Sequence, residues 1–236
     1  AEPAAIAVGV NYLLVRAGAY YHDIGKMIKP KYYSENQTTP EDKKIYQNIT
    51  PNMAVLIIKK HIREGIDLGR KHGLPQEIID FIPQHHGTSL IRYFYSLAVQ
   101  RAEEAGSTDE VREEDFRYPG PKPQSIETAI VMLADSAEAI TTSKMAQAHL
   151  DEDDIRRLVH TAVLNQFNDG QFDECNMTLR DLHLIEETFV KTLVSRYHHR
   201  VRYPEAKKPD APSTGGKGPQ GPQTGDEKNG QSRKKT

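Results

Sequence analysis

Apolar residues recur at intervals of three and four along most of this chain, which is the period of a helix with one buried face. The period predicts a helix from 12 to about 23, a second that begins at Thr50-Pro51 and a third that follows Gly73-Leu74-Pro75. The expected inward-facing residues of the second helix are Val55, Leu56, Ile58, Ile62 and Ile66, and those of the third are Ile78, Ile79 and Ile82. No stretch alternates convincingly over the length of a strand, so the pattern predicts an all-α fold.

Local capping signals predict where the other helices begin. Asn11 can cap the helix that starts at 12, after a short helix ending near Val10, and Ser125 can cap a helix from Ile126 to about Thr142. Further helices are expected from Leu90 to about Ala105, from the acidic run 151–154 to near Phe167, and from Thr178 to about His199. The segments 29–50 and 106–123 are polar or rich in proline and are expected to be loops. Gly25 follows a helix end and is expected to be left-handed.

The composition changes at Pro204. From there the chain is rich in Pro, Gly, Lys, Ser, Gln and Asp and has no aromatic or branched aliphatic residue, so it cannot bury enough apolar surface to offset the entropy of ordering. We therefore expect one helical domain over 1–203 and a disordered tail over 204–236. The chain starts within an alanine-rich, helix-like segment without a start signal, so we expect it to be part of a longer protein.

Composition and charge exclude several classes of protein. With 37% hydrophobic and 27% charged residues the chain is of the ordinary globular kind, and no apolar run is long enough to span a bilayer. The net charge of −2 argues against a nucleic-acid polymer as partner. The single cysteine, Cys175, excludes an internal disulfide, and we assign it a packing role.

Six polar residues stand in or at the ends of segments that otherwise have the pattern of buried helices. Imidazole nitrogens and carboxylates are the ligands that first-row divalent metals take, and segments far apart in a helical bundle can converge on one cavity. These residues are His22, Asp23, His61, His85, His86 and Asp135. Taken singly, each could equally be a polar residue at the edge of the core that hydrogen bonds a backbone group.

The order of these six residues resembles that of the HD-domain metal-dependent phosphohydrolases. Four longer stretches, 18–26, 84–90, 115–123 and 131–136, are similar to the cytoplasmic HD domain of the seven-transmembrane HD-family proteins. Those proteins are bacterial membrane phosphodiesterases that hydrolyse cyclic di-AMP. The resemblance covers about residues 1–200, and it implies an HD-domain helical bundle with a dinuclear metal site in its core.

The resemblance implies a division of labour among the six residues. His22, Asp23 and Asp135 would hold one divalent ion and His61, His85 and His86 the other, with Asp23 bridging, and iron or manganese would suit such ligands. His22 and Asp23 would be the catalytic pair, and cyclic di-AMP would be hydrolysed to pApA through a metal-bound hydroxide. The family also has a histidine upstream of His-Asp, in a helix cut off here at Ala1, so we expect weakened metal occupancy or activity.

The resemblance also implies that the domain lies in the cytoplasm, as part of a bacterial inner-membrane protein attached through upstream segments, and it leaves open whether that protein is an oligomer. Candidate substrate contacts are Lys26 and Arg92 for a phosphate, Thr88 and Ser89 as neutral donors, and Tyr21 or Tyr20 for stacking on adenine. The alternative is that the lysine and arginine are simply solvated and that the tyrosines belong to the core.

Two other functions stay open. Other HD proteins act on nucleoside triphosphates, guanosine tetraphosphate (ppGpp) or cyclic di-GMP, although the Gly-Tyr-Pro motif of the cyclic di-GMP enzymes is absent after His85-His86. A non-catalytic module that binds a nucleotide as a sensor would keep the same fold. The full set of downstream ligands argues against this second alternative.

Overall fold

The computed structural model describes residues 1–33, 36–37, 49–106 and 110–198. By its internal contacts the chain divides into Ala1–Arg200 and Val201–Thr236, and all the described residues belong to the first unit. Within them the structure is helical, with one isolated antiparallel bridge between Leu90 and Arg117 and no strand. This confirms the predicted all-α fold. The predicted tail from Pro204 lies outside the described residues.

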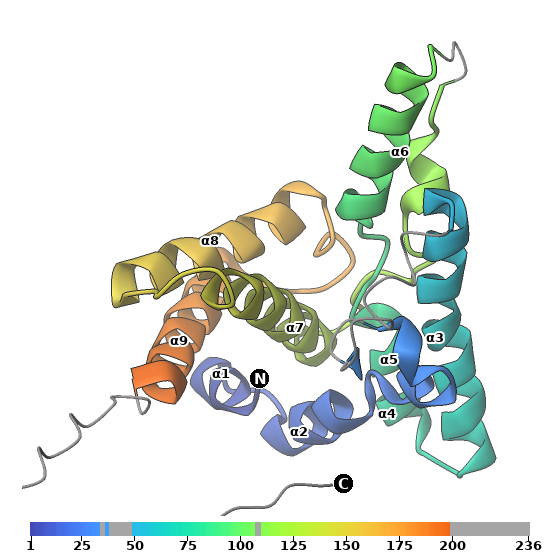
Figure 1. Cartoon of the computed structure of the whole chain (residues 1–236). Helices are drawn as coiled ribbons and strands as arrows, with labels where there is room; N and C mark the ends of the chain where they lie inside the picture. The colour runs from blue at the N-terminus through green and yellow to red at the C-terminus, as the bar shows by residue number, and fades with distance from the viewer. Residues whose placement is uncertain (34–35, 38–48, 107–109, 199–236) are drawn as a thin grey trace, which may run out of the picture. The chain divides into compact units, whose positions relative to one another are not determined.

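The elements follow one another as nine α-helices and three short 3-10 helices in the described part of the chain (Figure 1). Their bounds are α1 Glu2–Val8, α2 Tyr12–Tyr21, η1 Ile24–Ile28, η2 Pro30–Tyr32, α3 Pro51–Lys71, α4 Gln76–Ile79, α5 Phe81–Gln84, α6 Arg92–Glu104, η5 Glu113–Phe116, α7 Ile126–Met145, α8 Glu152–Asn168 and α9 Leu179–His198. Within the described ranges, none of these helices combines the length and the apolar character that a membrane span requires.

The predicted caps are present at the helix starts. Asn11 Oδ1 accepts the Leu14 N–H at 3.1 Å, and Thr50 Oγ1 accepts the Met53 N–H at 3.3 Å, ahead of Pro51. Reciprocal capping boxes open α7 and α8, and a similar pair opens α9; they join Ser125 to Thr128, Asp151 to Asp154 and Thr178 to Asp181. These starts were predictable because each cap depends only on residues three positions apart.

The main core lies where α1, α2, α7, α8 and α9 pack on one another. In Figure 1, α7 runs from α8 and α9 toward α5, and the described part of the core includes Val15, Phe81, Ile130, Leu133, Ile155 and Ile185. A smaller apolar cluster, formed by Ala54, Val55, Phe94 and Phe116, joins α3 to α6 and η5. The elements that carry or precede the six candidate ligands belong to both clusters: α2, α5 and α7 contribute residues to the main core, and α3 contributes to the smaller one.

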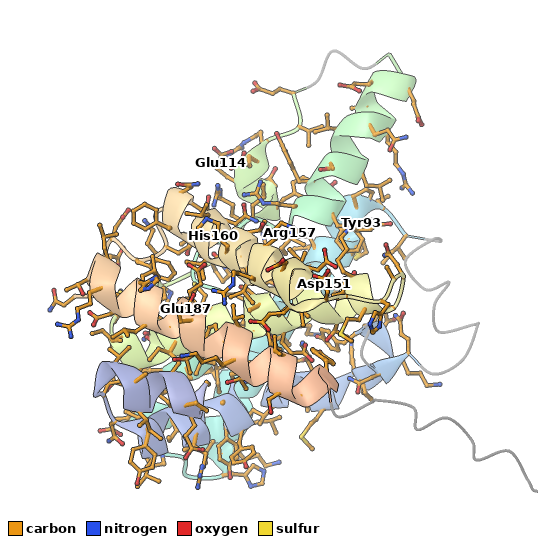
Figure 2. All side chains as sticks on the ribbon, turned by 90° about the vertical axis from the view of Figure 1, so that its left-hand side faces the viewer. Tyr93, Glu114, Asp151, Arg157, His160 and Glu187 are labelled. Carbon is orange, nitrogen blue, oxygen red and sulfur yellow. The ribbon has the colours of Figure 1, made fainter. Side chains whose placement is uncertain are left out.

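Polar side chains join α8 and α9 along their exposed side. The two helices lie side by side (Figure 2). An ion pair connects Arg156 to Glu187, and His160 Nδ1 lies 2.9 Å from Glu186 Oε1. His160 is thus a surface histidine with a local partner. Pairs this exposed contribute little to stability.

Three expectations about local structure are wrong. Leu56 is 63% exposed, because α3 packs inward through a line of small residues, Ala54, Gly65 and Gly69, that lies beside the predicted stripe. The single helix predicted after Pro75 is divided at Asp80 into α4 and α5, although its inward residues Ile78, Ile79 and Ile82 are buried as predicted. The segments 29–50 and 106–123, predicted as loops, contain η2 and η5 in their described parts.

Gly25 is also not the left-handed residue that was predicted. It lies inside η1 and does not have a positive φ. Its need for glycine comes from packing: a Cβ at this position would overlap the backbone carbonyl of His61 and lie 2.6 Å from the amide nitrogen of Gly65. Gly25 therefore lets η1 contact the backbone of α3 directly, and this contact brings Asp23 close to His61.

Candidate metal centre

The structure brings the six predicted ligands together from four separate segments. His22 and Asp23 follow α2, His61 is in the middle of α3, His85 and His86 follow α5, and Asp135 is in α7. Their ligand atoms form two groups, and within each group all the atoms lie within 4.8 Å of one another. One group is Asp23, His61, His85 and His86, and the other is His22, Asp23 and Asp135.

Asp23 belongs to both groups, and its two carboxylate oxygens face different partners. Oδ1 lies 3.5 Å from Nε2 of His61 and 3.5 Å from Nε2 of His85. Oδ2 lies 3.2 Å from Nε2 of His22, which in turn is 3.8 Å from Oδ1 of Asp135. One carboxylate therefore supplies an oxygen to each of the two ligand groups.

Three of the histidines are oriented by their own helices. Nδ1 of His22, His61 and His85 lies 2.9, 2.6 and 2.7 Å from a carbonyl oxygen in the preceding turn, those of Ala19, Ile58 and Ile82. When Nδ1 carries its proton and donates it to this carbonyl, Nε2 is left with a lone pair directed at the centre. Such hydrogen bonds to the second ring nitrogen commonly fix the tautomer and orientation of metal-binding histidines.

Three polar atoms in the centre are buried without a hydrogen-bond partner in the described structure: Asp23 Oδ1, His61 Nε2 and His85 Nε2. An isolated buried polar atom without a partner costs free energy, and native structures contain few of them. Here the three face one another, all are acceptors when the imidazoles are neutral, and acceptors cannot satisfy each other. A divalent cation would satisfy all three, so the donor set fits a metal ion.

Burial and neighbouring charges shift the pKa values of His61 and His86 in one direction and that of His22 in the other. Burial lowers the pKa of His61 to about 4 and holds the pKa of His86 well below its usual value, so both imidazoles are neutral near pH 7. Burial also opposes a charge on His22, but hydrogen bonds to Asp135 and Asp23 outweigh it and raise the pKa of His22 to about 10. Asp23 is half-buried, and this desolvation would raise its pKa, but its contacts with His22 and His85 outweigh it and keep the pKa below the usual range.

Lys26 and Tyr118 border the centre. Lys26 Nζ lies 2.7 Å from Asp23 Oδ2 and 5.5 Å from the centre of the Tyr33 ring. The ring of Tyr118 stacks on His86, with 4.1 Å between ring centres and 12° between their planes. Lys26 was a predicted phosphate contact, and the structure places it against the ligand cluster. Tyr118 was not singled out from the sequence, because its segment has no periodic pattern.

Of the other predicted substrate contacts, Thr88 and Ser89 already have hydrogen-bond partners within the protein, and the remaining three are exposed. Ser89 Oγ donates a hydrogen bond to the His86 carbonyl at 2.7 Å, and Thr88 hydrogen bonds to Gln171 and Arg117. Arg92 is exposed at the start of α6. Tyr20 and Tyr21, at the end of α2, are 76% and 39% exposed, so neither is a core residue.

Comparison with known proteins identifies the family. A model of the HD domain matches residues 1–140, which include all six candidate ligands. The chain belongs to the HD domain family. The HD domain is metal-dependent, in agreement with the two ligand groups found here.

Curated relatives of this HD domain include two named cyclic-di-AMP phosphodiesterase PgpH. The protein from Bacillus subtilis (strain 168) is 43% identical over 210 residues, and that from Listeria monocytogenes serotype 1/2a (strain 10403S) is 39% identical over 210 residues; each match covers 88% of this chain. An uncharacterized protein from Synechocystis, slr0104, is 43% identical over 206 residues, or 87% of this chain. The chain spans only 25 to 28% of the length of these relatives.

Two solved structures have the same fold as this HD domain. The HD domain of L. monocytogenes phosphodiesterase PgpH in complex with cyclic di-AMP is 38% identical, with a TM-score of 0.73 over 83% of this chain and 86% of that one. A second structure of the same HD domain gives a TM-score of 0.72 at 38% identity, over 84% of this chain and 88% of that one. The predicted HD-type helical bundle is therefore confirmed.

Proposed function

We propose that this HD domain is a metal-dependent phosphodiesterase that hydrolyses cyclic di-AMP to the linear dinucleotide pApA. The observation that carries the proposal is the convergence of three unpartnered buried atoms, Asp23 Oδ1, His61 Nε2 and His85 Nε2, in one cluster. Relatives at 39 and 43% identity named as cyclic-di-AMP phosphodiesterases, and the complex of the Listeria HD domain with cyclic di-AMP, support the choice of substrate.

The proposal includes two divalent ions, iron or manganese. His61, His85 and His86 would hold one and His22 and Asp135 the other, with Asp23 between them; this follows the two ligand groups of the structure. When bound, such a pair of ions supplies Lewis acidity at the phosphate and an activated water as nucleophile. The mixed imidazole and carboxylate ligands suit both metals.

Asp23, His22 and Lys26 would prepare the centre for its ligands. The ion pair between Lys26 Nζ and Asp23 Oδ2 fixes the carboxylate so that Oδ1 faces the imidazoles of His61 and His85. His22 holds a proton between two carboxylates in the metal-free state, because its pKa is raised to about 10, and it would release this proton when Nε2 becomes a ligand.

Lys26 is the substrate contact that the geometry favours most. Its ammonium group lies at the edge of the ligand cluster, where it would meet a phosphate oxygen of the substrate. Arg92 and Tyr21 have exposed side chains, so they would be available for a second phosphate and for an adenine. The hydroxyls of Thr88 and Ser89 are already engaged within the protein. As the resemblance implies, we also place the domain in the cytoplasm as part of a bacterial inner-membrane protein.

The test is hydrolysis by the purified protein loaded with Mn²⁺ or Fe²⁺ under anaerobic conditions, with the products separated by chromatography. We expect pApA from cyclic di-AMP and much slower turnover of cyclic di-GMP, ppGpp and a deoxynucleoside triphosphate. Rapid turnover of one of these and none of cyclic di-AMP would replace the proposed substrate. Full metal content with nucleotide binding but no turnover would favour the sensing module.

Matched variants test the site. The double variant His22→Ala/Asp23→Ala should lose both metal and hydrolysis, because Asp23 contributes to both ligand groups. The control is His160→Ala/Asp153→Ala, which removes the same residue types from α8, where His160 pairs only with Glu186 in the described structure. Hydrolysis retained by the first variant would exclude the assigned site.

A further inference from the structure

One fully buried glutamine contacts the turn that follows His85-His86. Gln171 lies three residues beyond the end of α8 and is 0% exposed. It lies outside residues 1–140, the part that the HD family model matches. A buried amide must satisfy both its oxygen and its nitrogen, so its partners are strongly specified.

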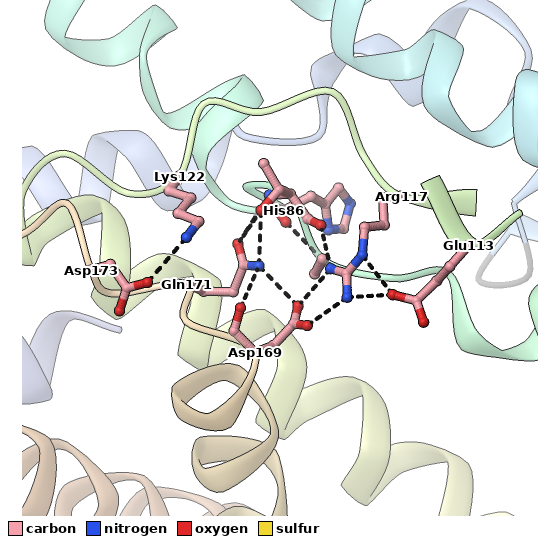
Figure 3. Close-up of polar contacts among 9 residues, drawn as sticks. His86, Glu113, Arg117, Lys122, Asp169, Gln171 and Asp173 are labelled. Carbon is pink, nitrogen blue, oxygen red and sulfur yellow. Dashed lines mark hydrogen bonds and ion pairs between the residues drawn. The ribbon is translucent and has the colours of Figure 1, made fainter. Parts of the chain in front are cut away.

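The side-chain amide of Gln171 forms hydrogen bonds with Thr88, 83 positions away. Its Oε1 accepts the Thr88 N–H at 2.9 Å, and its Nε2 donates to Thr88 Oγ1 at 3.0 Å. Nε2 also lies 2.9 Å from Asp169 Oδ2, to which it donates (Figure 3). The same side chain therefore holds the backbone and the hydroxyl of Thr88.

Arg117 holds the remaining polar group of Thr88 and fixes Asp169. Its guanidinium donates to the Thr88 carbonyl at 2.9 Å and pairs with both oxygens of Asp169 at 2.8 and 3.1 Å (Figure 3). Its Nε donates to Glu113 at 2.8 Å. The N–H, the carbonyl and the hydroxyl of Thr88 thus all have partners supplied by two distant segments.

The turn between His86 and Thr88 fits closely under Gln171. Gly87 has φ +53°, and a Cβ there would overlap Gln171 Oε1 and lie 2.9 Å from Met132 Cε. His22, His61 and His85 each have an Nδ1 hydrogen bond to a carbonyl, and in the described structure His86 has none. The orientation of His86 therefore depends on its ring contacts with Tyr118, His85 and His61 and on the backbone of this turn.

We propose that Gln171 is a positioning residue for the metal centre. By holding Thr88, it fixes the turn that follows His85-His86, and so keeps the His86 imidazole directed at the group formed with Asp23, His61 and His85. The Arg117–Asp169 pair holds Gln171 in turn. The inference rests on the proposed metal-dependent function, but it concerns the affinity of one ion and not the identity of the substrate.

The test compares Mn²⁺ binding by wild type and by Gln171→Met. Calorimetric titration measures the affinities, and metal analysis after gel filtration measures how many ions stay bound. Methionine keeps the volume but cannot accept the Thr88 N–H. We expect wild type to bind two ions and the variant to bind one of them tenfold to a hundredfold more weakly, the usual effect of losing a residue that orients metal ligands. The affinity for the other ion should stay within twofold.

The control is Ile185→Ala, in the core on α9, because it lowers thermal stability without touching the centre. Full metal content in this variant, at an equal or lower melting temperature than Gln171→Met, shows that general destabilisation does not release the ion. If Gln171→Met does not fold, Thr88→Val tests the hydroxyl half of the contact: it keeps the Thr88 N–H bond to Gln171 Oε1, removes the partner of Gln171 Nε2, and should weaken the same ion by a smaller factor.

The outcomes separate this inference from the proposed function. Two ions in wild type and two equally tight ions in Gln171→Met, or in Thr88→Val as its replacement, would overturn the positioning role alone. Wild type that binds no Mn²⁺ or Fe²⁺ would overturn the proposed function, and the positioning role with it. Loss of both ions together in Gln171→Met, with Ile185→Ala intact, would also contradict a role limited to one ligand group.

Discussion

At the scale of single residues, Asp23 determines how the centre is built. One carboxylate serves both ligand groups, and its position depends on the contact between η1 and α3 and on the ion pair with Lys26. Without a cation, Asp23 Oδ1 and the Nε2 atoms of His61 and His85 are left unsatisfied, which costs roughly 1 to 3 kcal/mol for each buried group. The cluster is thus a local cost to stability that binding of a cation would remove.

Gly25 provides a test of this contact. In Gly25→Ala the new methyl group overlaps the His61 carbonyl, so η1 must move away from α3 and carry Asp23 with it. We expect a loss of about 1 to 3 kcal/mol in the free energy of unfolding, the usual cost of overpacking, and a loss of metal content. Urea denaturation and metal analysis measure the two effects.

The control for Gly25→Ala is Gly106→Ala, where a Cβ would meet nothing within 4 Å but the φ of +62° is strained for alanine. It should lose stability and keep its metal. Normal metal content in Gly25→Ala would show that Asp23 does not depend on this close approach.

At the scale of elements, the helices and their caps could be predicted from the sequence, because both depend on neighbours along the chain. Asn11, Thr50 and Ser125 each cap a helix through an atom three residues away, and the structure has all three bonds. Gly25 was assigned the wrong role because the backbone of α3, which excludes its side chain, comes from a segment some forty positions later. Leu56 was also assigned the wrong role, because the face of α3 that the rest of the fold covers does not include it.

The candidate site was only partly predictable for the same reason. His22-Asp23 and His85-His86 are visible as adjacent pairs at helix ends, and the resemblance to HD proteins joins them to His61 and Asp135. Gln171 and Tyr118 have no local signal: one follows the end of α8 and the other lies in a proline-rich segment. Only the tertiary structure brings them to His86 and Thr88.

Asp169, the residue that follows α8, should make the stability of the fold depend on pH. The cost of burying Asp169 is outweighed by hydrogen bonds from Arg117 and Gln171, so its pKa lies below the usual value, while Glu113 and Arg92 complete the surrounding charges. A lowered pKa stabilises the fold above the unfolded-state pKa, about 4, and this stabilisation is lost as the pH falls through the folded-state value.

Asp169→Asn should therefore lower the free energy of unfolding by about 1.5 to 3 kcal/mol at pH 7, the range for hydrogen bonds to charged groups. The difference from wild type should shrink below pH 4. Urea denaturation at pH 7, 5 and 3.5 measures it. A difference independent of pH would mean that the ionised form of Asp169 is not what stabilises the fold.

At the scale of the whole molecule, the centre joins parts that pack on different clusters. Phe81 of α5 and Ile130 of α7 belong to the main core, whereas Val55 of α3 belongs to the smaller cluster with α6 and η5. One proposed ion would link α3 to the end of α5, the other would link α7 to the end of α2, and Asp23 would connect the two groups. Metal binding and folding should be coupled throughout the described domain, since the unfolded chain cannot assemble this set of ligands.

This coupling predicts a large effect of metal on thermal stability. A free Mn²⁺ concentration a hundred times the dissociation constant should add about 2.7 kcal/mol to the free energy of unfolding for each ion. For a domain of this size that corresponds to roughly 5 to 11 °C in melting temperature per ion. Scanning calorimetry with Mn²⁺, and again after EDTA, measures the shift and its reversal.

His61→Ala should lose most of the rise in melting temperature that one ion produces, because His61 Nε2 lies 3.5 Å from Asp23 Oδ1. His160→Ala should keep the full rise. Equal shifts in both variants would show that the bound ions stabilise the protein at some other place.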